Sequence, residues 1–528
     1  MRSAHFAVLA AALAALAVVP RAAVGSVTST ETTRYVVVLA GEETADGFQL
    51  AGTKEAVTSL VTLAGGSVTY DLSKQIGVLV VDSPNASFAE ALRASPLVVE
   101  AAEDFKWKAF PTREEAIASG QLTVMHDGEP LPGGGPEPRG GDPLEPLQWS
   151  KRLIRAPEAH AIQAGSPLVE VGILDTGIDG EHLDFVDMDG ALYAGSRVPY
   201  SNVNCAKGAD FTTPGPGIGN PDPCTDNGFH GTHVAGIVAA RASNGVGVAG
   251  VAPNIELIPV KVCDTVGYCY ASNTAAGITY AGDMKFEVIN MSFYVDDDTF
   301  LESHEFKCMS DPVQRAFRTA NERAIRYARK QGVVPVAALG NSDNDLAHPP
   351  EPYENECEVV PAETDGVIGT MSLGPTSEKA YYSNHGFGMT DVAAPGGNSR
   401  NRQGAEIPGP CGTQVLSTIP GNLYGCFQGT SMASPHAAGV AALIVSQFGR
   451  IGNDAGAPDV VMRPQDVENH LQSTTIDLTR VGDNKLNGYD ACFGNGRIDA
   501  VKAVTHDTSV VRHPVEAPAD SRGCPSFR

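Results

Sequence analysis

An α/β fold is predicted for residues 147–507, with a doubly wound, mostly parallel sheet and helices on both of its faces. A smaller α+β domain is predicted in residues 26–110. The composition and order of the segments predict the larger domain. From Trp149 onward, short strands that are apolar on both faces alternate with helical segments, a pattern typical of a parallel sheet covered on both sides. Functional residues are then expected at the carboxyl ends of the strands.

The N-terminal domain is predicted from the order of its elements. Residues 34–40 are an apolar strand, and residues 53–63 have helical spacing of apolar side chains. Two strands follow in 67–72 and 76–81, then a helix in 86–93 and a strand in 97–101. The order β-α-β-β-α-β is the ferredoxin-like plan, which by itself says little about function.

Residues 1–25 have the features of a signal peptide. Arg2 supplies a positive charge, residues 6–19 form an apolar run, and small residues follow Pro20. The run is shorter than the about 20 residues that span a bilayer, although an uncleaved anchor is the alternative. We therefore expect a secreted, extracellular protein with no membrane partner.

Two further segments complete the predicted organisation. Between Pro130 and Pro146, 11 of 17 residues are Gly or Pro, so residues 111–146 are expected to be an exposed linker. Residues 508–528 are expected to be a C-terminal tail after the α/β domain.

Charge and cysteine content narrow the function classes. The chain has 37 Lys and Arg against 62 Asp and Glu, a formal net charge of −25, which disfavours nucleic acid and anionic membranes as partners. The ten cysteines all lie at or after Cys205. Their even number predicts disulfides in an oxidising compartment, and short spacings allow 205 with 224, 263 with 269, and 411 with 426. The sequence leaves the pairing open, and a structural zinc site is the weaker alternative because no C-x-x-C spacing occurs.

Three residues suggest nucleophilic catalysis. Asp175 ends the strand VEVGILD, His233 lies in HGTHVAG at the start of an apolar helix, and Ser431 lies in GTSMASPHAAGV at another helix start. A serine hydroxyl needs an adjacent base, a histidine can be that base, and a buried aspartate can hold its tautomer. Each residue alone has a structural explanation, as a turn former, a packing residue or a helix cap. The pair His230 and His233 lacks the glutamate of a zinc hydrolase motif.

Together, in the order Asp, His, Ser, these segments resemble the three signatures of the subtilisin-like serine protease family. The resemblance covers about residues 147–505, including YYSNHG (381–386) and DVAAPGG (391–397). It implies an endopeptidase that cleaves protein or peptide substrates through an acyl-enzyme on Ser431, with no cofactor for catalysis. It also implies that residues 26–110 are an inhibitory pro-domain, a partner of the enzyme that is removed by autoprocessing.

The resemblance also assigns further site residues. Asn341, after the strand GVVPVAAL, stands where the family has its oxyanion-hole asparagine. Ser292 and Phe293 stand in the segment that pairs with the substrate, and Gly267 stands on the opposite substrate-binding edge. Tyr294 departs from the family, which usually has glycine there, and should reshape the pocket. The family's tight calcium site would be formed here by Asp184, Asn244 and the backbone carbonyls of Val246 and Val248.

Two alternatives to a general secreted protease stay open. One is an inactive member of the fold that serves as a binding module, and the other is a dedicated processing protease with a single substrate. The family's usual maturation cut would fall near Phe110, but Pro111 follows it and should make that bond a poor substrate. A mature N-terminus between Thr112 and Leu147 is therefore predicted.

Overall fold

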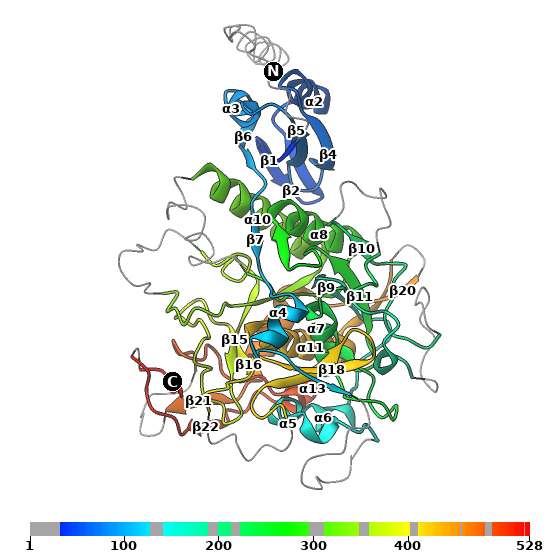
Figure 1. Cartoon of the computed structure of the whole chain (residues 1–528), viewed down its shortest axis with the longest axis vertical. Coiled ribbons are helices and arrows are strands. Elements are labelled where there is room, and N and C mark those ends of the chain that lie inside the picture. Colours follow the sequence, from blue (N-terminus) through cyan, green and yellow to red (C-terminus); the bar gives the residue numbers. More distant parts are fainter. Residues whose placement is uncertain are drawn as a thin grey trace.

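The computed structural model describes two domains (Figure 1). The described residues are 32–126, 141–187, 199–212, 222–294, 311–347, 358–401, 410–454, 457–480, 488–521 and 523–527. The predicted signal peptide, residues 1–25, lies outside them. Within these ranges, no helix is long and apolar enough to span a membrane.

The N-terminal domain is a four-stranded antiparallel sheet with two helices on one face. Its strand order is β4-β5-β1-β6, which is the predicted ferredoxin-like plan. Apolar residues of β1 and β5 pack with both helices in a core of their own. The elements are β1 (Thr33–Leu39), β2 (Gly41–Thr44), β3 (Gly47–Leu50), α2 (Lys54–Leu63), β4 (Ser67–Leu72), β5 (Val78–Ser83), α3 (Phe88–Arg93) and β6 (Val98–Glu103).

The main domain is built on a parallel sheet, as predicted. Among the described residues its seven strands have the order β10-β11-β9-β13-β14-β15-β16. The strands are β9 (Glu170–Asp175), β10 (Ala209–Asp210), β11 (Glu256–Lys261), β13 (Val288–Met291), β14 (Val334–Ala338), β15 (Ile368–Leu373) and β16 (Val392–Pro395). The helices are α5 (Trp149–Leu153), α6 (Ala156–His160), α7 (His230–Ala239), α8 (Ala271–Met284), α10 (Pro312–Gln331), α11 (Thr430–Phe448), α12 (Pro464–Ser473) and α13 (Ala500–Thr505).

Helices cover both faces of this sheet. Val171 and Ile173 of β9 pack in the core that contains α7 and α11. Leu174 of the same strand packs in a second core with α8 and α10. Successive side chains of a strand point to opposite faces, so a strand between two helical layers must be apolar at every position. This requirement explains the continuous apolar runs in the sequence.

The N-terminal domain docks on α8 and α10 of the main domain. Val36 and Val38, on the face of β1 away from its own helices, belong to the core of α8 and α10. Charges of opposite sign surround this contact: Arg315 pairs with Glu100 at 2.7 Å, and Lys330 pairs with Glu43 at 3.0 Å. The domain is therefore held by apolar burial at the centre and by ion pairs at the edge.

The prediction of a linker over residues 111–146 is wrong for its described parts. Helix α4 (Arg113–Ala118) and strand β8 (Thr123–His126) fold there, and β8 pairs with β18 (Leu423–Phe427) beside β17 (Val415–Ile419). Leu122 and Met125 are 3% exposed, so this part carries enough apolar surface to pack. The main domain also begins before residue 147, because Leu144 is fully buried. Residues 127–140 lie outside the described chain.

The predicted C-terminal tail packs on the main domain over its described residues. Strand β22 (Arg512–Val515) pairs with β21 (Asp477–Arg480), and Cys524 is bonded to Cys492. The three short-spaced cysteine pairs form disulfides as anticipated, 205 with 224, 263 with 269, and 411 with 426. These eight cysteines are bonded to one another and are not zinc ligands. The remaining short elements are β7 (Lys106–Lys108), η1 (Glu145–Leu147), η2 (Leu183–Phe185), β12 (Tyr268–Tyr270), β19 (Arg450–Asp454) and β20 (Ala457–Val461).

Candidate active site

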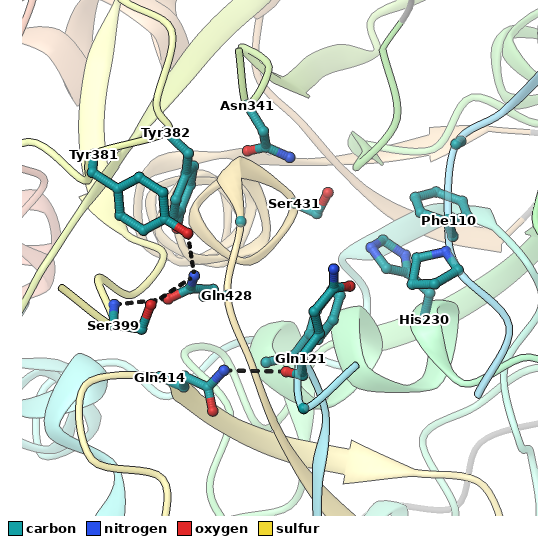
Figure 2. A pocket seen from close by; sticks show the side chains of 15 residues that line it. Phe110, Gln121, His230, Asn341, Tyr381, Tyr382, Ser399, Gln414, Gln428 and Ser431 are labelled. Carbon is teal, nitrogen blue, oxygen red and sulfur yellow. Dashed lines mark hydrogen bonds between the residues drawn. The ribbon is translucent and has the colours of Figure 1, made fainter. Parts of the chain in front are cut away.

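A pocket of about 400 Å³ lies where the carboxyl ends of the central strands meet the first turns of α7 and α11. Figure 2 shows Phe110 and His230 on one side of Ser431, and Tyr381, Tyr382 and Gln428 on the other. The lining residues are Ala109, Phe110, Pro111, Gly120, Gln121, His230, Asn341, Tyr381, Tyr382, Ser399, Gln414, Phe427, Gln428, Gly429 and Ser431.

Asp175 and His230 form a buried pair beside this pocket. Asp175 is the last residue of β9 and His230 is the first residue of α7. The Nδ1 atom of His230 lies 2.9 and 3.0 Å from the two carboxylate oxygens of Asp175. The close approach needs glycine at 231, because a Cβ there would collide with the carbonyl oxygen of Gly177. With Nδ1 donating to Asp175, Nε2 is the ring atom left to act as a base.

The prediction of His233 as the catalytic base is wrong. His233 lies one helical turn further along α7, does not line the pocket, and its Nε2 contacts the carbonyl oxygen of Gly425 at 2.9 Å. Burial lowers its pKa to about 3. The motif HGTHVAG contains both histidines, and its residue types alone do not show which of the two is the catalytic base. The position of His230 at the helix start, next to the glycine that allows contact with the loop after β9, is the signal that separates them.

Ser431 lies in the first turn of α11 and is 6% exposed. Its hydroxyl donates to the carbonyl oxygen of Ser292 at 3.0 Å, and the Ser292 hydroxyl donates to the carbonyl oxygen of Ser431 at 2.8 Å. His230 Nε2 is buried and has no hydrogen-bond partner among the described residues. In this form of the chain the serine is therefore not bonded to the histidine.

Asn341 follows β14 and is oriented by Thr430. Its Oδ1 atom accepts hydrogen bonds from the backbone N–H and from the hydroxyl of Thr430, both at 2.9 Å. With Oδ1 engaged in this way, the amide Nδ2 is the donor available to the pocket. In the first turn of α11 the Thr430 N–H is bonded to Asn341 and the Met432 N–H to the carbonyl oxygen of Gly429 at 2.9 Å. The Ser431 N–H is therefore the backbone group left to act as a further donor on the same side.

None of the four predicted substrate-binding residues lines this pocket, but Ser292 contacts Ser431 and Gly267 contacts Phe110, which do. Ser292 and Phe293 follow β13 and are buried, whereas Tyr294 is half-buried and packs against the same core. Gly267 lies on the opposite edge, directly before β12. The disulfide between Cys263 and Cys269 closes the loop that holds this edge.

The chain's own residues 109–111 line the pocket, and residues 106–108 lie along β12 beside it. Strand β7 pairs antiparallel with β12, with Trp107 opposite Cys269. The carbonyl oxygen of Gly267 accepts the N–H of Ala109 at 2.8 Å and that of Phe110 at 3.2 Å. The Phe110 ring stacks on His230 with 3.7 Å between ring centroids. An extended segment of the protein thus lies on the edge predicted to bind substrate, a contact that the sequence motifs did not reveal.

The other side of the pocket is formed by residues that the sequence analysis did not assign. The Tyr382 hydroxyl lies 3.0 Å from the carbonyl oxygen of Gly396, and burial raises its pKa far above the ordinary value. The Arg400 guanidinium lies 3.7 Å from the centre of the Tyr381 ring. These groups give the pocket a polar and aromatic wall beyond Ser431.

The predicted calcium loop is held by two buried carboxylates. Asp184 is fully buried, and burial raises its pKa well above the ordinary value. It accepts the N–H of Val248 at 2.9 Å. Asn244 directs its amide nitrogen to the carbonyl oxygen of Val186 at 3.0 Å, and its oxygen accepts the N–H of Val246 at 2.9 Å. The second carboxylate, Asp142, accepts the N–H of Ser243 at 2.6 Å.

Only part of this arrangement fits a calcium ion. The buried carboxylates are ligands of the kind that calcium prefers, but the Asn244 oxygen is turned to the backbone. The described residues contain no group of three or more His, Cys, Asp or Glu side chains placed to hold a metal. Calcium binding therefore stays a prediction.

Comparison with known proteins gives a consistent result. A model of the subtilase family matches residues 168–496. The thermophilic serine proteinase of Bacillus sp. (strain AK1) is 33% identical over 348 residues, which cover 66% of this chain and 64% of that protein. Thermitase of Thermoactinomyces vulgaris is 32% identical over 359 residues, covering 68% of this chain and 96% of that protein.

The fold also matches solved structures. The crystal structure of an epidermin leader peptide processing serine protease from Staphylococcus aureus superposes with a TM-score of 0.63 and covers 91% of this chain and 99% of that one. At 19% sequence identity, this similarity shows the fold alone.

Proposed function

The chain belongs to the subtilase family of serine proteases, and from this premise we propose that it is a secreted endopeptidase that hydrolyses peptide bonds through an acyl-enzyme on Ser431. The observation that supports this most is the buried Asp175–His230 pair beside a pocket that Ser431 and Asn341 also line. Asp175, His230 and Ser431 then have the functions of orienting group, base and nucleophile.

The first half-reaction follows from these positions. The Ser431 oxygen attacks the carbonyl carbon of the substrate while His230 Nε2 takes the hydroxyl proton. Asp175 holds the imidazole in the tautomer with the proton on Nδ1 and stabilises its positive charge. Asn341 Nδ2 and the backbone N–H of Ser431 at the start of α11 bind the tetrahedral oxyanion, assisted by the helix dipole. His230 then protonates the leaving amine, the C–N bond breaks, and an acyl ester remains on Ser431.

Water completes the cycle by the reverse path. His230 takes a proton from a water molecule, which attacks the ester carbonyl, and returns the proton to the Ser431 oxygen as the C–O bond breaks. The product acid then leaves. No step needs a cofactor.

The N-terminal domain is proposed to be an inhibitory pro-domain. Support comes from its docking on α8 and α10 and from the passage of residues 106–111 along β12 in the cleft. Secretion is proposed from the signal-like residues 1–25 and from the described disulfides, which are typical of oxidising compartments.

Structural calcium at the Asp184 loop is proposed on the charge of the two buried carboxylates. A divalent cation would offset the cost of burying Asp184 and Asp142 together. If the ion binds only the native protein, EGTA should lower the melting temperature, and an unchanged melting curve would remove the claim.

The proposed reaction is tested at Ser431. Phenylmethylsulfonyl fluoride should form an adduct that mass spectrometry locates on Ser431 of the processed enzyme, and Ser431→Ala should abolish both the adduct and peptide hydrolysis. A processed enzyme that forms no adduct and cleaves no member of a peptide library would instead support the inactive binding module.

A further inference from the structure

The described residues at the C-terminus, 512–521 and 523–527, are bonded to the chain that leads into the pocket. We call them the C-terminal segment. The backbone N–H of Lys379 donates to the carbonyl oxygen of Pro525 at 2.8 Å, and Lys379 pairs with Ser526 in a parallel bridge. A disulfide joins the segment to the main domain. The segment is therefore fixed beside Lys379 by backbone contacts and by a covalent bond.

The side chain of Lys379 is fully buried and lies between two carboxylates. Its Nζ atom is 2.6 Å from Oδ1 of Asp343 and 3.6 Å from Oδ2 of Asp520. The side chain of Asp520, in the C-terminal segment, is also fully buried, and its Oδ1 accepts the N–H of Cys524 at 2.9 Å. A buried ammonium ion is costly unless carboxylates pair with it. Lys379 therefore couples the position of the C-terminal segment to that of Asp343.

Asp343 belongs to the loop that carries the proposed oxyanion donor. It lies two residues after Asn341, and its φ of 57° is in the left-handed region, which aspartate tolerates better than most residues other than glycine. Its N–H donates to the carbonyl oxygen of Tyr382 at 2.7 Å, and Tyr382 lines the pocket together with Asn341 (Figure 2). A backbone in this conformation depends on the contacts around it. The Lys379 ammonium supplies one of these contacts directly after Asn341.

We propose that Lys379 and Asp520 are positioning residues for the oxyanion site, and that the C-terminal segment thereby helps to set the turnover rate. This rests on the proposed function, because it needs Asn341 to bind the oxyanion. Neither residue lines the pocket, so both act through Asp343. An oxyanion donor loses its effect when it is displaced by about 1 Å. Its hydrogen bond forms in the transition state, so a displaced loop should lower kcat and leave KM unchanged.

The experiment measures kcat and KM of the processed enzyme with a peptide substrate. The active sites are first counted by labelling Ser431 to completion with a fluorophosphonate, so that kcat refers to active serine alone. The combined variant Lys379→Met with Asp520→Asn removes the buried ammonium and the buried carboxylate together, so no fully buried charge is left alone. Its kcat should fall about tenfold to a hundredfold, with KM unchanged.

A second buried lysine provides the matched control. Lys502 in α13 is 2% exposed and pairs with Asp507 at 3.4 Å, and it does not line the pocket. Lys502→Met with Asp507→Asn also removes an ion pair of a buried lysine. It should leave kcat per labelled serine unchanged, because lost stability alone lowers the number of active sites and not their turnover.

A double-mutant cycle tests whether the effect passes through Asn341. In Asn341→Ala enzyme, adding Lys379→Met and Asp520→Asn should lower kcat no further, because the donor is already absent. If the combined variant does not fold, Asp343→Asn removes the ion pair from its partly exposed end, keeps a residue that tolerates the left-handed conformation, and should show the same fall in kcat.

Three results would overturn the proposal: an unchanged kcat in the folded variants, an equal fall in the control, or a full additional loss in the Asn341→Ala enzyme. A wild-type enzyme that neither labels nor cleaves peptides would contradict the proposed function itself. The two failures are therefore distinguishable, because the first three results are obtained with an active wild-type enzyme.

Discussion

At the scale of single residues, two histidines one helical turn apart have different environments. His230 bonds to Asp175 at the pocket, and His233 bonds to a backbone carbonyl in the core. The sequence places Asp175 at a strand end and Ser431 at a helix start, and the structure has both there. The sequence prediction took His233 instead of His230, because the choice depends on which histidine α7 brings to the end of β9 when the helix packs.

Burial of His233 predicts an acid-sensitive stability. Its pKa is lowered to about 3, whereas an exposed histidine titrates near pH 6.5. Between these values the unfolded chain binds a proton that the native chain does not, so stability present above about pH 6.5 is lost as the pH falls. The comparison is made in the Ser431→Ala protein, which cannot digest itself. Between about pH 6 and pH 4, the free energy of unfolding should fall by about 2 kcal/mol less when His233→Gln is added than in Ser431→Ala alone.

Urea unfolding at the two pH values measures this difference. Other buried groups, including His436, are the same in both proteins and do not affect the comparison. Identical losses in parent and variant would show that His233 is not the source.

The amide of Asn341 should matter for turnover. Asn341→Ala removes the proposed oxyanion donor and should lower kcat about a hundredfold to a thousandfold. It also removes the acceptor of the Thr430 N–H, so Asn341→Asp, which keeps an acceptor and loses the donor, separates the two effects. Near-normal turnover in both folded variants would show that another group binds the oxyanion.

At the scale of elements, periodicity predicted the parallel strands, because burial between two helical layers dictates their composition. The pairing of β8 with β18 was not predicted. Their residues are about 300 positions apart in the chain, and β8 is short and precedes the Gly- and Pro-rich stretch. Local composition carries no information on such a distant partner.

The packing of residues 112–126 can be tested by truncating Leu122. Because Leu122 is 3% exposed, Leu122→Ala should destabilise the uncut Ser431→Ala protein by about 2–5 kcal/mol. Ile117 in the same segment is 47% exposed, so Ile117→Ala is the matched control. It should change the free energy of unfolding by no more than about 0.5 kcal/mol. Denaturant unfolding measures both, and equal effects would mean that this segment does not pack as described.

At the scale of the whole molecule, one continuous chain joins the N-terminal domain, the cleft and the sheet beside it. Leu122 and Leu144 are both buried in the main domain while residues 106–126 still join it to the N-terminal domain. If the N-terminal domain is removed as proposed, we therefore expect its removal to change access to the pocket more than the packing of the main domain.

The position of the mature N-terminus follows from this arrangement. We expect it between Thr112 and Leu147, because the Phe110–Pro111 bond is turned away from the oxyanion donors and ends in proline. N-terminal sequencing of the active protein measures it. A single start at Pro111, or one upstream, would contradict the expectation.

The central claim is that His230, paired with Asp175, activates Ser431. The most direct measurement compares peptide hydrolysis by His230→Ala and His233→Ala, after an added cysteine protease has cut every protein between its N-terminal domain and Leu147 and has then been blocked. We predict that His230→Ala loses about a millionfold in kcat, and that His233→Ala, where it is folded, stays within about tenfold of wild type because its ring is outside the pocket. A folded His230→Ala enzyme with substantial turnover, or an inactive but folded His233→Ala enzyme, would contradict the account.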